Sequence, residues 1–148
     1  MARVEAIYLF PVRGGAPSRR PSAHAVAGLG LDGDHHQAQP SLFGLCEKPE
    51  NQLTLIEGEA LDRLRPPLPP GASRRNLVTR GVPLNDLVGR TFRIGAMRAR
   101  GLELCDPCLH LEEMTRPGVL RALVNRGGLR AEILETGTVN EGDTIEVE

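Results

Sequence analysis

The feature of this sequence that most restricts its fold is the shortness of its regular segments. The 148 residues include 17 glycines and 12 prolines, which interrupt every apolar run after a few residues. Alternating or apolar patterns predict strands at 3–10, 22–27, 51–55, 75–79, 91–94, 97–105, 129–135 and 143–147. Because strands and helices do not alternate regularly, we expect a mainly β fold, a barrel or a sandwich, and not a parallel α/β sheet.

Three short helices are predicted among these strands. The segment 56–65 has apolar residues at helical spacing and is followed by a proline-rich stretch that ends a helix. The other two helices are predicted at 107–114 and 118–125, the latter followed by Gly127 and Gly128 in C-cap positions.

Size and composition exclude several classes of protein. The length suits a single domain over 1–148. A net charge of −1 argues against a general nucleic-acid binder. No apolar run approaches the roughly 20 residues of a membrane-spanning helix, and the N-terminus does not resemble a signal peptide, so we expect a cytoplasmic protein without a membrane partner. The odd number of cysteines, three, predicts reduced thiols.

Arginine provides all the basic residues except Lys48. Its planar guanidinium suits phosphate and other oxyanions. A preference for arginine codons in the source genome explains the same bias, and both interpretations stay open.

Three ordered stretches carry a family resemblance. The first is Gly-Leu-Gly-Leu-Asp-Gly-Asp-His-His at 28–36, and the second runs from Arg-Asn-Leu-Val at 75–78 to a glycine at 95. The third is Cys-Asp-Pro-Cys at 105–108, followed by Arg-Gly-Gly-Leu-Arg-Ala at 126–131 and a closing Gly-Asp. Together they resemble the MOSC family, named for the C-terminal domain of molybdenum cofactor sulfurases.

This resemblance implies a MOSC-like β-barrel with a few short helices, and molybdenum cofactor binding or sulfur transfer at a characteristic cysteine that matches Cys108. It also implies reduction of N-hydroxylated small-molecule substrates. Large relatives carry pyridoxal-phosphate desulfurase, iron–sulfur or flavin modules. The sequence shows none of these modules, so the electron or sulfur donor is expected to be another protein.

The local sequence supports a reactive Cys108. Asp106 is a good helix cap and Pro107 suits the first helical position, which places Cys108 in the first turn. The helix dipole there favours a thiolate, the form that attacks sulfur or binds molybdenum, whereas the Asp106 carboxylate opposes it. Which effect is larger stays open.

Other interpretations of the cysteines compete with this one. Free cysteine is often a small buried apolar residue. Cys105 is interpreted as structural or as a resolving thiol for Cys108. A zinc site is a further alternative, with ligands drawn from His35, His36, Cys46, Cys105, Cys108 and His110.

Candidate cofactor-binding residues lie in the same motifs. They are Arg75, Asn76, Arg80, Arg126, Gly127, Gly128 and Arg130. The arginines and the amide offer donors to the phosphate and oxo groups of the cofactor, and the glycines let backbone amides approach it. The alternative is that the arginines are solvated and the glycines end a helix.

The Asp-Gly-Asp-His stretch is either a tight turn or part of the pocket rim. We expect His35 to be a catalytic proton carrier, a role that His36 competes for. The leading hypothesis is therefore a molybdenum cofactor protein with Cys108 as metal ligand and catalytic residue. The alternatives are a metal-free persulfide carrier using Cys108 and a non-catalytic anion- or partner-binding module.

Overall fold

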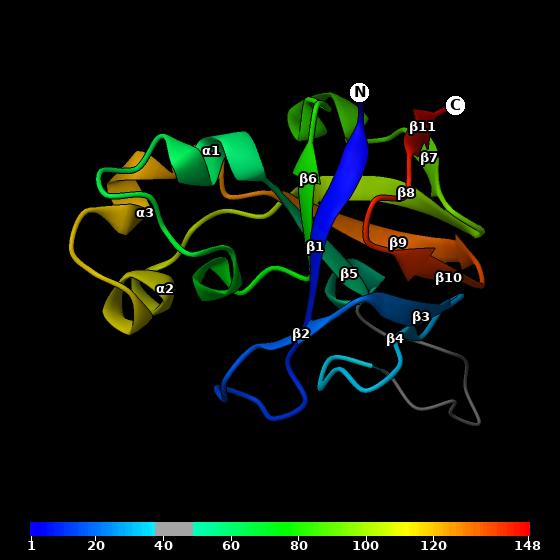
Figure 1. Ribbon diagram of the computed structural model, residues 1–148, viewed down its shortest axis with the longest axis horizontal. Coiled ribbons are helices and arrows are strands. Elements are labelled where there is room, and N and C mark those ends of the chain that lie inside the picture. Colours follow the sequence, from blue (N-terminus) through cyan, green and yellow to red (C-terminus); the bar gives the residue numbers. More distant parts are fainter. Residues whose placement is uncertain (38–48) are drawn as a thin grey trace.

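The computed structural model describes residues 1–37 and 49–148. Eight strands form one mixed sheet in the order β11-β7-β8-β9-β5-β6-β1-β2 (Figure 1). Its strands are β1 (Arg3–Leu9), β2 (Ser18–Arg20), β5 (Leu53–Glu57), β6 (Leu77–Arg80), β7 (Thr91–Ile94), β8 (Met97–Leu104), β9 (Leu129–Glu135) and β11 (Ile145–Val147). A second sheet has the order β10-β3-β4, with strands β3 (Ser22–Val26), β4 (Gly30–Leu31) and β10 (Gly137–Asn140).

The helical elements are short. The α-helices are α1 (Gly58–Asp62), α2 (Leu109–Met114) and α3 (Val119–Ala122), and the 3-10 helices are η1 (Pro49–Asn51), η2 (Pro70–Ser73) and η3 (Leu84–Leu87). Within the described residues, no helix has the length and apolar character needed to cross a membrane.

The expected closed barrel is not found among the described residues. All pairs in the large sheet are antiparallel except β5 and β6, which run parallel and are joined through α1 and η2. The Val4 amide donates to the Asp143 carbonyl at 2.9 Å, and the Gly142 amide donates to the Val4 carbonyl at 2.8 Å. These bonds join β1 to the turn before β11 by an isolated bridge and not by a full strand pair. The mainly β prediction is confirmed, but the barrel is not.

Several element boundaries differ from the predictions for reasons of tertiary pairing. Ile56 and Glu57 begin the predicted helix but belong to β5, where they pair in parallel with Val78 and Thr79. No strand was predicted between 135 and 143, but residues 137–140 form β10. Only Val139 is buried in this segment, between exposed Thr138 and Asn140, so the sequence is too short to show a repeated alternation, and pairing with β3 holds the strand.

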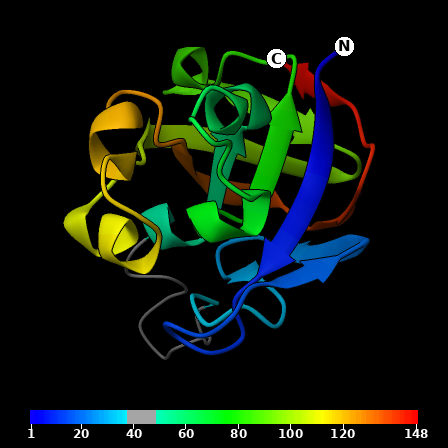
Figure 2. The ribbon, with the colours of Figure 1, turned by 60° about the vertical axis from the view of Figure 1, so that its left-hand side comes forward.

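Two hydrophobic clusters occupy opposite faces of the central strands. Ile7 and Leu9 of β1 pack in the cluster that includes the small sheet, whereas Ala6 and Tyr8 pack in the cluster that includes the three α-helices. Figure 2 shows these helices gathered on one side of the molecule. Burial of both faces explains why β1 is almost continuously apolar. The helical side of the sheet carries the site described next.

Candidate functional site

A pocket opens between the ends of several strands and helix α2. Its volume is about 290 Å³. It is lined by Phe10, Arg13, Gly14, His35, His36, Thr54, Arg74, Arg75, Asn76, Cys105, Cys108, His110, Leu111 and Arg130. Thr54 pairs in register with Arg130, and the Thr54 amide donates to the Asn76 side-chain oxygen at 3.2 Å. These residues therefore lie in one row across the sheet, which forms the floor of the pocket.

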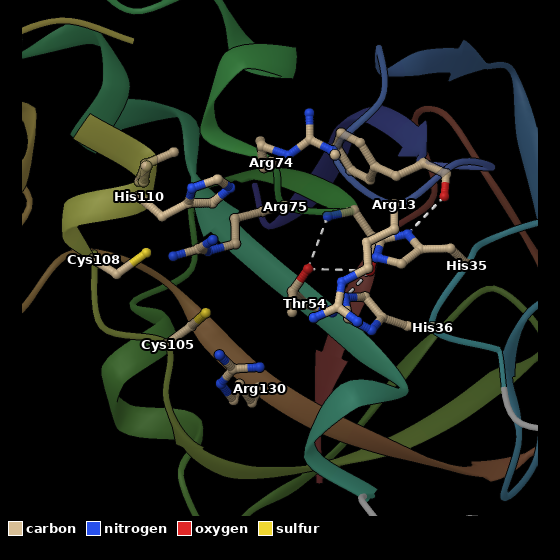
Figure 3. Close-up of a pocket in the computed structure, with 14 residues that line it drawn as sticks. Arg13, His35, His36, Thr54, Arg74, Arg75, Cys105, Cys108, His110 and Arg130 are labelled. Carbon is tan, nitrogen blue, oxygen red and sulfur yellow. Dashed lines mark hydrogen bonds between the residues drawn. The ribbon is translucent and has the colours of Figure 1, made fainter. Parts of the chain in front are cut away.

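The pocket has two chemically different ends (Figure 3). Cys105, Cys108 and His110 lie at one end, and both sulfur atoms face into the pocket. His35, His36 and Arg13 lie at the other end, with Arg75 between the two groups (Figure 3). This arrangement suits an elongated ligand with a soft, thiol-binding end and an anionic end.

The two cysteines differ in exposure. Cys105 directly follows β8, and its amide donates to the Gly128 carbonyl at 2.7 Å. Cys105 is only 1% exposed, whereas Cys108 is exposed, and both are free thiols. Cys108 is therefore not the buried apolar residue that the alternative interpretation required.

Helix α2 begins two residues later than predicted. Cys108 is itself the N-cap residue, with an extended backbone and no side-chain capping bond, and its carbonyl accepts the Glu112 amide at 3.2 Å. Asp106 is thus not the cap, and Pro107 is not in the first turn. Pro107 lies before the helix, close to Gly127, where a Cβ would lie 2.7 Å from Pro107 Cδ.

Gly127 and Gly128 allow close approach of backbones and do not cap a helix. A Cβ on Gly127 would lie 2.2 Å from the Cys105 carbonyl oxygen. A Cβ on Gly128, whose φ is +115°, would lie 2.1 Å from the Leu55 carbonyl oxygen. Helix α3 ends earlier, with Leu123 as its C-cap. These glycines therefore seat the Cys105 backbone against the sheet.

Asp34 fixes the histidine end of the pocket. Its buried carboxylate accepts the Phe10 amide at 2.8 Å, the Asn76 side-chain amide at 3.3 Å and the His36 amide at 3.1 Å. The His35 Nδ1 lies 2.7 Å from the Phe10 carbonyl oxygen, and a carbonyl only accepts. His35 therefore carries its proton on Nδ1, which leaves Nε2 available to a ligand when the ring is neutral.

The two histidine rings are in contact, with centroids 3.9 Å apart. Burial of the His36 ring, followed by the charge of nearby His35, lowers the pKa of His36 below its ordinary value. His36 is therefore neutral near pH 7. The structure brings both histidines into the pocket and leaves their expected roles as predictions.

The predicted cofactor-binding residues divide into two groups. Arg75 and Arg130 line the pocket, and Arg75 Nε donates to the Gly127 carbonyl at 2.9 Å. Asn76 also lines it, but its side-chain amide is already bonded to the Tyr8 carbonyl and to Asp34. The family resemblance predicted that Asn76 contacts the cofactor, whereas the hydrogen bonds of its side-chain amide are to other groups of the protein.

Arg80 and Arg126 lie outside the pocket. Arg80 binds the Asp62 carboxylate at 2.6 Å and the Glu5 carboxylate at 2.9 Å, and these bonds, that to Asp62 most of all, raise the pKa of Arg80. Arg126 is exposed and does not line the pocket. The structure therefore does not bring these two arginines together with Arg75 and Arg130.

Sequence reasoning missed Arg13 and Arg74. The Arg74 guanidinium carbon lies 4.5 Å from the centre of the Phe10 ring, and its Nη1 donates to the Gly15 carbonyl at 2.8 Å. Burial lowers the pKa of Arg74. The neighbouring Arg-Asn motif was a signal for Arg74, but Arg13 lies in a loop that only the fold brings to the site.

The pocket lining is cationic. Four arginines line it, and neither an aspartate nor a glutamate does so among the described residues. The residues 1–37 and 49–148 contain no group of three or more histidine, cysteine or acidic side chains arranged to hold a metal ion. The zinc alternative gains no support there, and Cys46, one of its candidate ligands, lies outside the described residues.

Comparisons with known proteins agree with this architecture. The MOSC domain family model matches residues 32–146. The structure resembles the YuaD protein from Bacillus subtilis, with a TM-score of 0.83 and 19% identity, covering 99% of this chain and 96% of that chain. It also resembles YiiM from Geobacillus stearothermophilus, with a TM-score of 0.74 and 12% identity, covering 100% and 75% of the two chains.

YiiM from Escherichia coli gives a TM-score of 0.65 and 17% identity, covering 99% of this chain and 69% of that chain. A search of curated protein sequences finds no match. The structural likenesses concern the fold, and the family model covers well over half of the sequence. The chain therefore belongs to the MOSC domain family.

Proposed function

We propose that the pocket binds the molybdenum cofactor, with Cys108 as a protein ligand of the metal. The observation that carries the proposal is the chemistry of the lining: thiols at one end, Arg13 with two histidines at the other and Arg75 between them, and no carboxylate among the described lining residues. The cofactor is a pterin with a phosphate tail and an oxo-metal head, so its two ends match the two ends of the pocket. When bound, it supplies two-electron redox chemistry.

The arginines are suited to the anionic part of such a ligand. Arg74 is held by Phe10 and by one bond to the Gly15 carbonyl, and its remaining donors have no hydrogen-bond partner among the described residues. Arg13 and Arg130 line the same cavity. Guanidinium groups in a partly desolvated pocket bind phosphate more strongly than they do in water.

The thiol end is suited to a soft metal. Cys108 is exposed toward the pocket, and His110 lies beside it (Figure 3). A thiolate is a suitable ligand for a soft transition metal. Cys108 would hold the metal together with the ligands that the cofactor itself brings.

The reaction class proposed from the family resemblance is reduction of an N-hydroxylated small molecule. Two electrons from an external donor protein and two protons convert N–OH to N–H and release water. His35 is proposed to pass a proton to the substrate through Nε2, which first takes that proton from solvent, because the Nδ1 proton is held by the Phe10 carbonyl.

The test is to express the protein in a host that makes the cofactor and to measure molybdenum and pterin per chain. We expect both in the wild type, less molybdenum in Cys108→Ser, and less pterin in Arg74→Gln. Arg80→Gln is the matched arginine control and should keep both, because Arg80 lies outside the pocket. Absence of pterin from the wild type would refute the proposal.

The exposure of Cys108 favours a second candidate function, a metal-free persulfide carrier. An exposed thiol is accessible to a cysteine desulfurase, which would transfer a sulfane sulfur to it. Cys105→Ala removes the neighbouring pocket thiol, so incubation of this variant with a desulfurase and mass measurement should show one added sulfur, and the same variant with Cys108→Ser should show none. A wild type that accepts neither sulfur nor cofactor would leave only an anion- or partner-binding module.

A further inference from the structure

The pocket contains a second thiol that the proposed function does not use. Cys105 and Cys108 are separated by two residues, line the same cavity and present their sulfur atoms to the same space (Figure 3). Cys105 is 1% exposed and Cys108 is exposed. A dissolved reagent therefore meets Cys108 first, and Cys105 is reached from within the pocket.

The two cysteines differ in the contacts that hold them. Cys108 lies before α2 with φ −128° and ψ 165°, and its side chain makes no capping bond. Cys105, in contrast, is fixed by the bond from its amide to the Gly128 carbonyl and by the close packing of Gly127 on its carbonyl. We therefore expect Cys108 and the residues just before it, and not Cys105, to move when the two sulfur atoms meet.

We propose that Cys105 is a resolving thiol that removes a sulfur-bound group from Cys108. The Cys105 thiolate, after losing its proton to solvent, attacks the Cys108 Sγ. A bond forms between the two sulfur atoms, and the bond from Cys108 to the departing sulfur breaks. The departing group leaves as a thiolate with the bonding electron pair.

With a low-molecular-weight disulfide as oxidant, the step is balanced. Cys108 first exchanges with the disulfide and releases one thiol, and the attack by Cys105 releases the other. Two protein thiols are oxidised to one disulfide, and the reagent is reduced to two thiols. A persulfide on Cys108 reacts in the same way and releases hydrosulfide. An external dithiol returns the pair to its reduced form.

The proposal gives the pocket a sulfur-releasing activity besides ligand binding. A protein that only carries sulfur needs Cys108 alone. With Cys105 beside it, the sulfur on Cys108 is released as hydrosulfide without a second protein. Disulfide formation also removes the Cys108 thiolate as a metal ligand. The reaction between the two cysteines does not involve the cofactor, so it is tested on protein prepared without the cofactor.

The experiment follows the reaction with an aromatic disulfide whose thiolate product is coloured. The protein carries Cys46→Ser, so that only the two pocket cysteines react. We expect two coloured thiolates per chain in two phases. The first rate should rise with reagent concentration, and the second should not, because the attack by Cys105 is intramolecular. Peptide mass mapping should then find a bond between Cys105 and Cys108.

Two variants separate the roles. Cys105→Ala should release one thiolate and keep a stable adduct on Cys108, while Cys108→Ala should react slowly in a single concentration-dependent phase. The proposal is refuted if the second phase of the parent protein speeds up with reagent, or if both cysteines carry adducts. The concentration dependence is measured on the parent, so the test holds even where a variant does not fold.

Discussion

The packing of Gly127 and Gly128 beneath the thiol end predicts a graded loss of stability on adding one methyl group. Gly127→Ala places Cβ 2.2 Å from the Cys105 carbonyl oxygen without a positive φ, so its cost is steric. Gly142→Ala has φ +88° and no atom within 4 Å of the new Cβ, so its cost is conformational. Gly128→Ala combines φ +115° with an approach of 2.1 Å.

The expected losses of stability follow from the steric cost and the conformational cost. A left-handed backbone costs a residue with a Cβ about 1–2 kcal/mol, which is the expected effect of Gly142→Ala. Overpacking costs about 1–3 kcal/mol, the expected effect of Gly127→Ala. If the terms add, Gly128→Ala loses about 2–5 kcal/mol. For a chain of about 150 residues, each kcal/mol lowers Tm by about 2–4 °C.

The assay is urea unfolding of the three variants and the wild type, with Tm as a second measurement. Gly128→Ala should lose more free energy of unfolding than either Gly127→Ala or Gly142→Ala. Equal losses for Gly142→Ala and Gly128→Ala would show that the close approach of the Leu55 carbonyl carries no energetic weight, and the packing argument would then fail.

Three other changes have defined outcomes. Asn76→Ala leaves buried donors and acceptors without partners and should lower the free energy of unfolding by about 2–4 kcal/mol, measured in urea. Because the pKa of His36 is lowered on folding, the unfolded state binds more protons just below pH 6.5, so stability should fall on acidification through that range. His36→Gln should weaken this dependence, whereas His24→Gln, at an exposed position, should preserve it. On α2, Leu111→Ala should cost about 2–5 kcal/mol, and Leu109→Ala, 60% exposed, should stay within about 0.5 kcal/mol; equal losses would contradict the packing of this helix.

The sequence predicted strands well where their pattern reflects burial. The segments 91–94 and 129–135 match β7 and β9 to the residue, because their buried positions alternate regularly. The strand β10 was missed, since it has a single buried residue, Val139, and its other residues are held by pairing with β3. The helix before the proline-rich stretch was placed too early, because parallel pairing with β6 draws Ile56 into the sheet.

The candidate site was predictable where its residues lie in local motifs. Arg75, Cys108 and His35 were named from their motifs, and all three line the pocket. Arg13 was not found, because nothing in its loop indicates which residues lie across the cavity. Arg80 belongs to the same motif as Arg75, yet it is the last residue of β6, where the acidic partners Glu5 and Asp62 hold it.

The row across the sheet has a consequence for how new chemistry arises on this fold. The floor is set by Thr54, Asn76 and Arg130, which the strand ladder and buried bonds hold in place. The walls come from the loop after β1 and the turn before α2, which contribute little to that ladder. A change of ligand therefore requires substitutions only in these two segments and not in the strands of the sheet. Ligand selectivity can then diverge among relatives while the sheet stays intact.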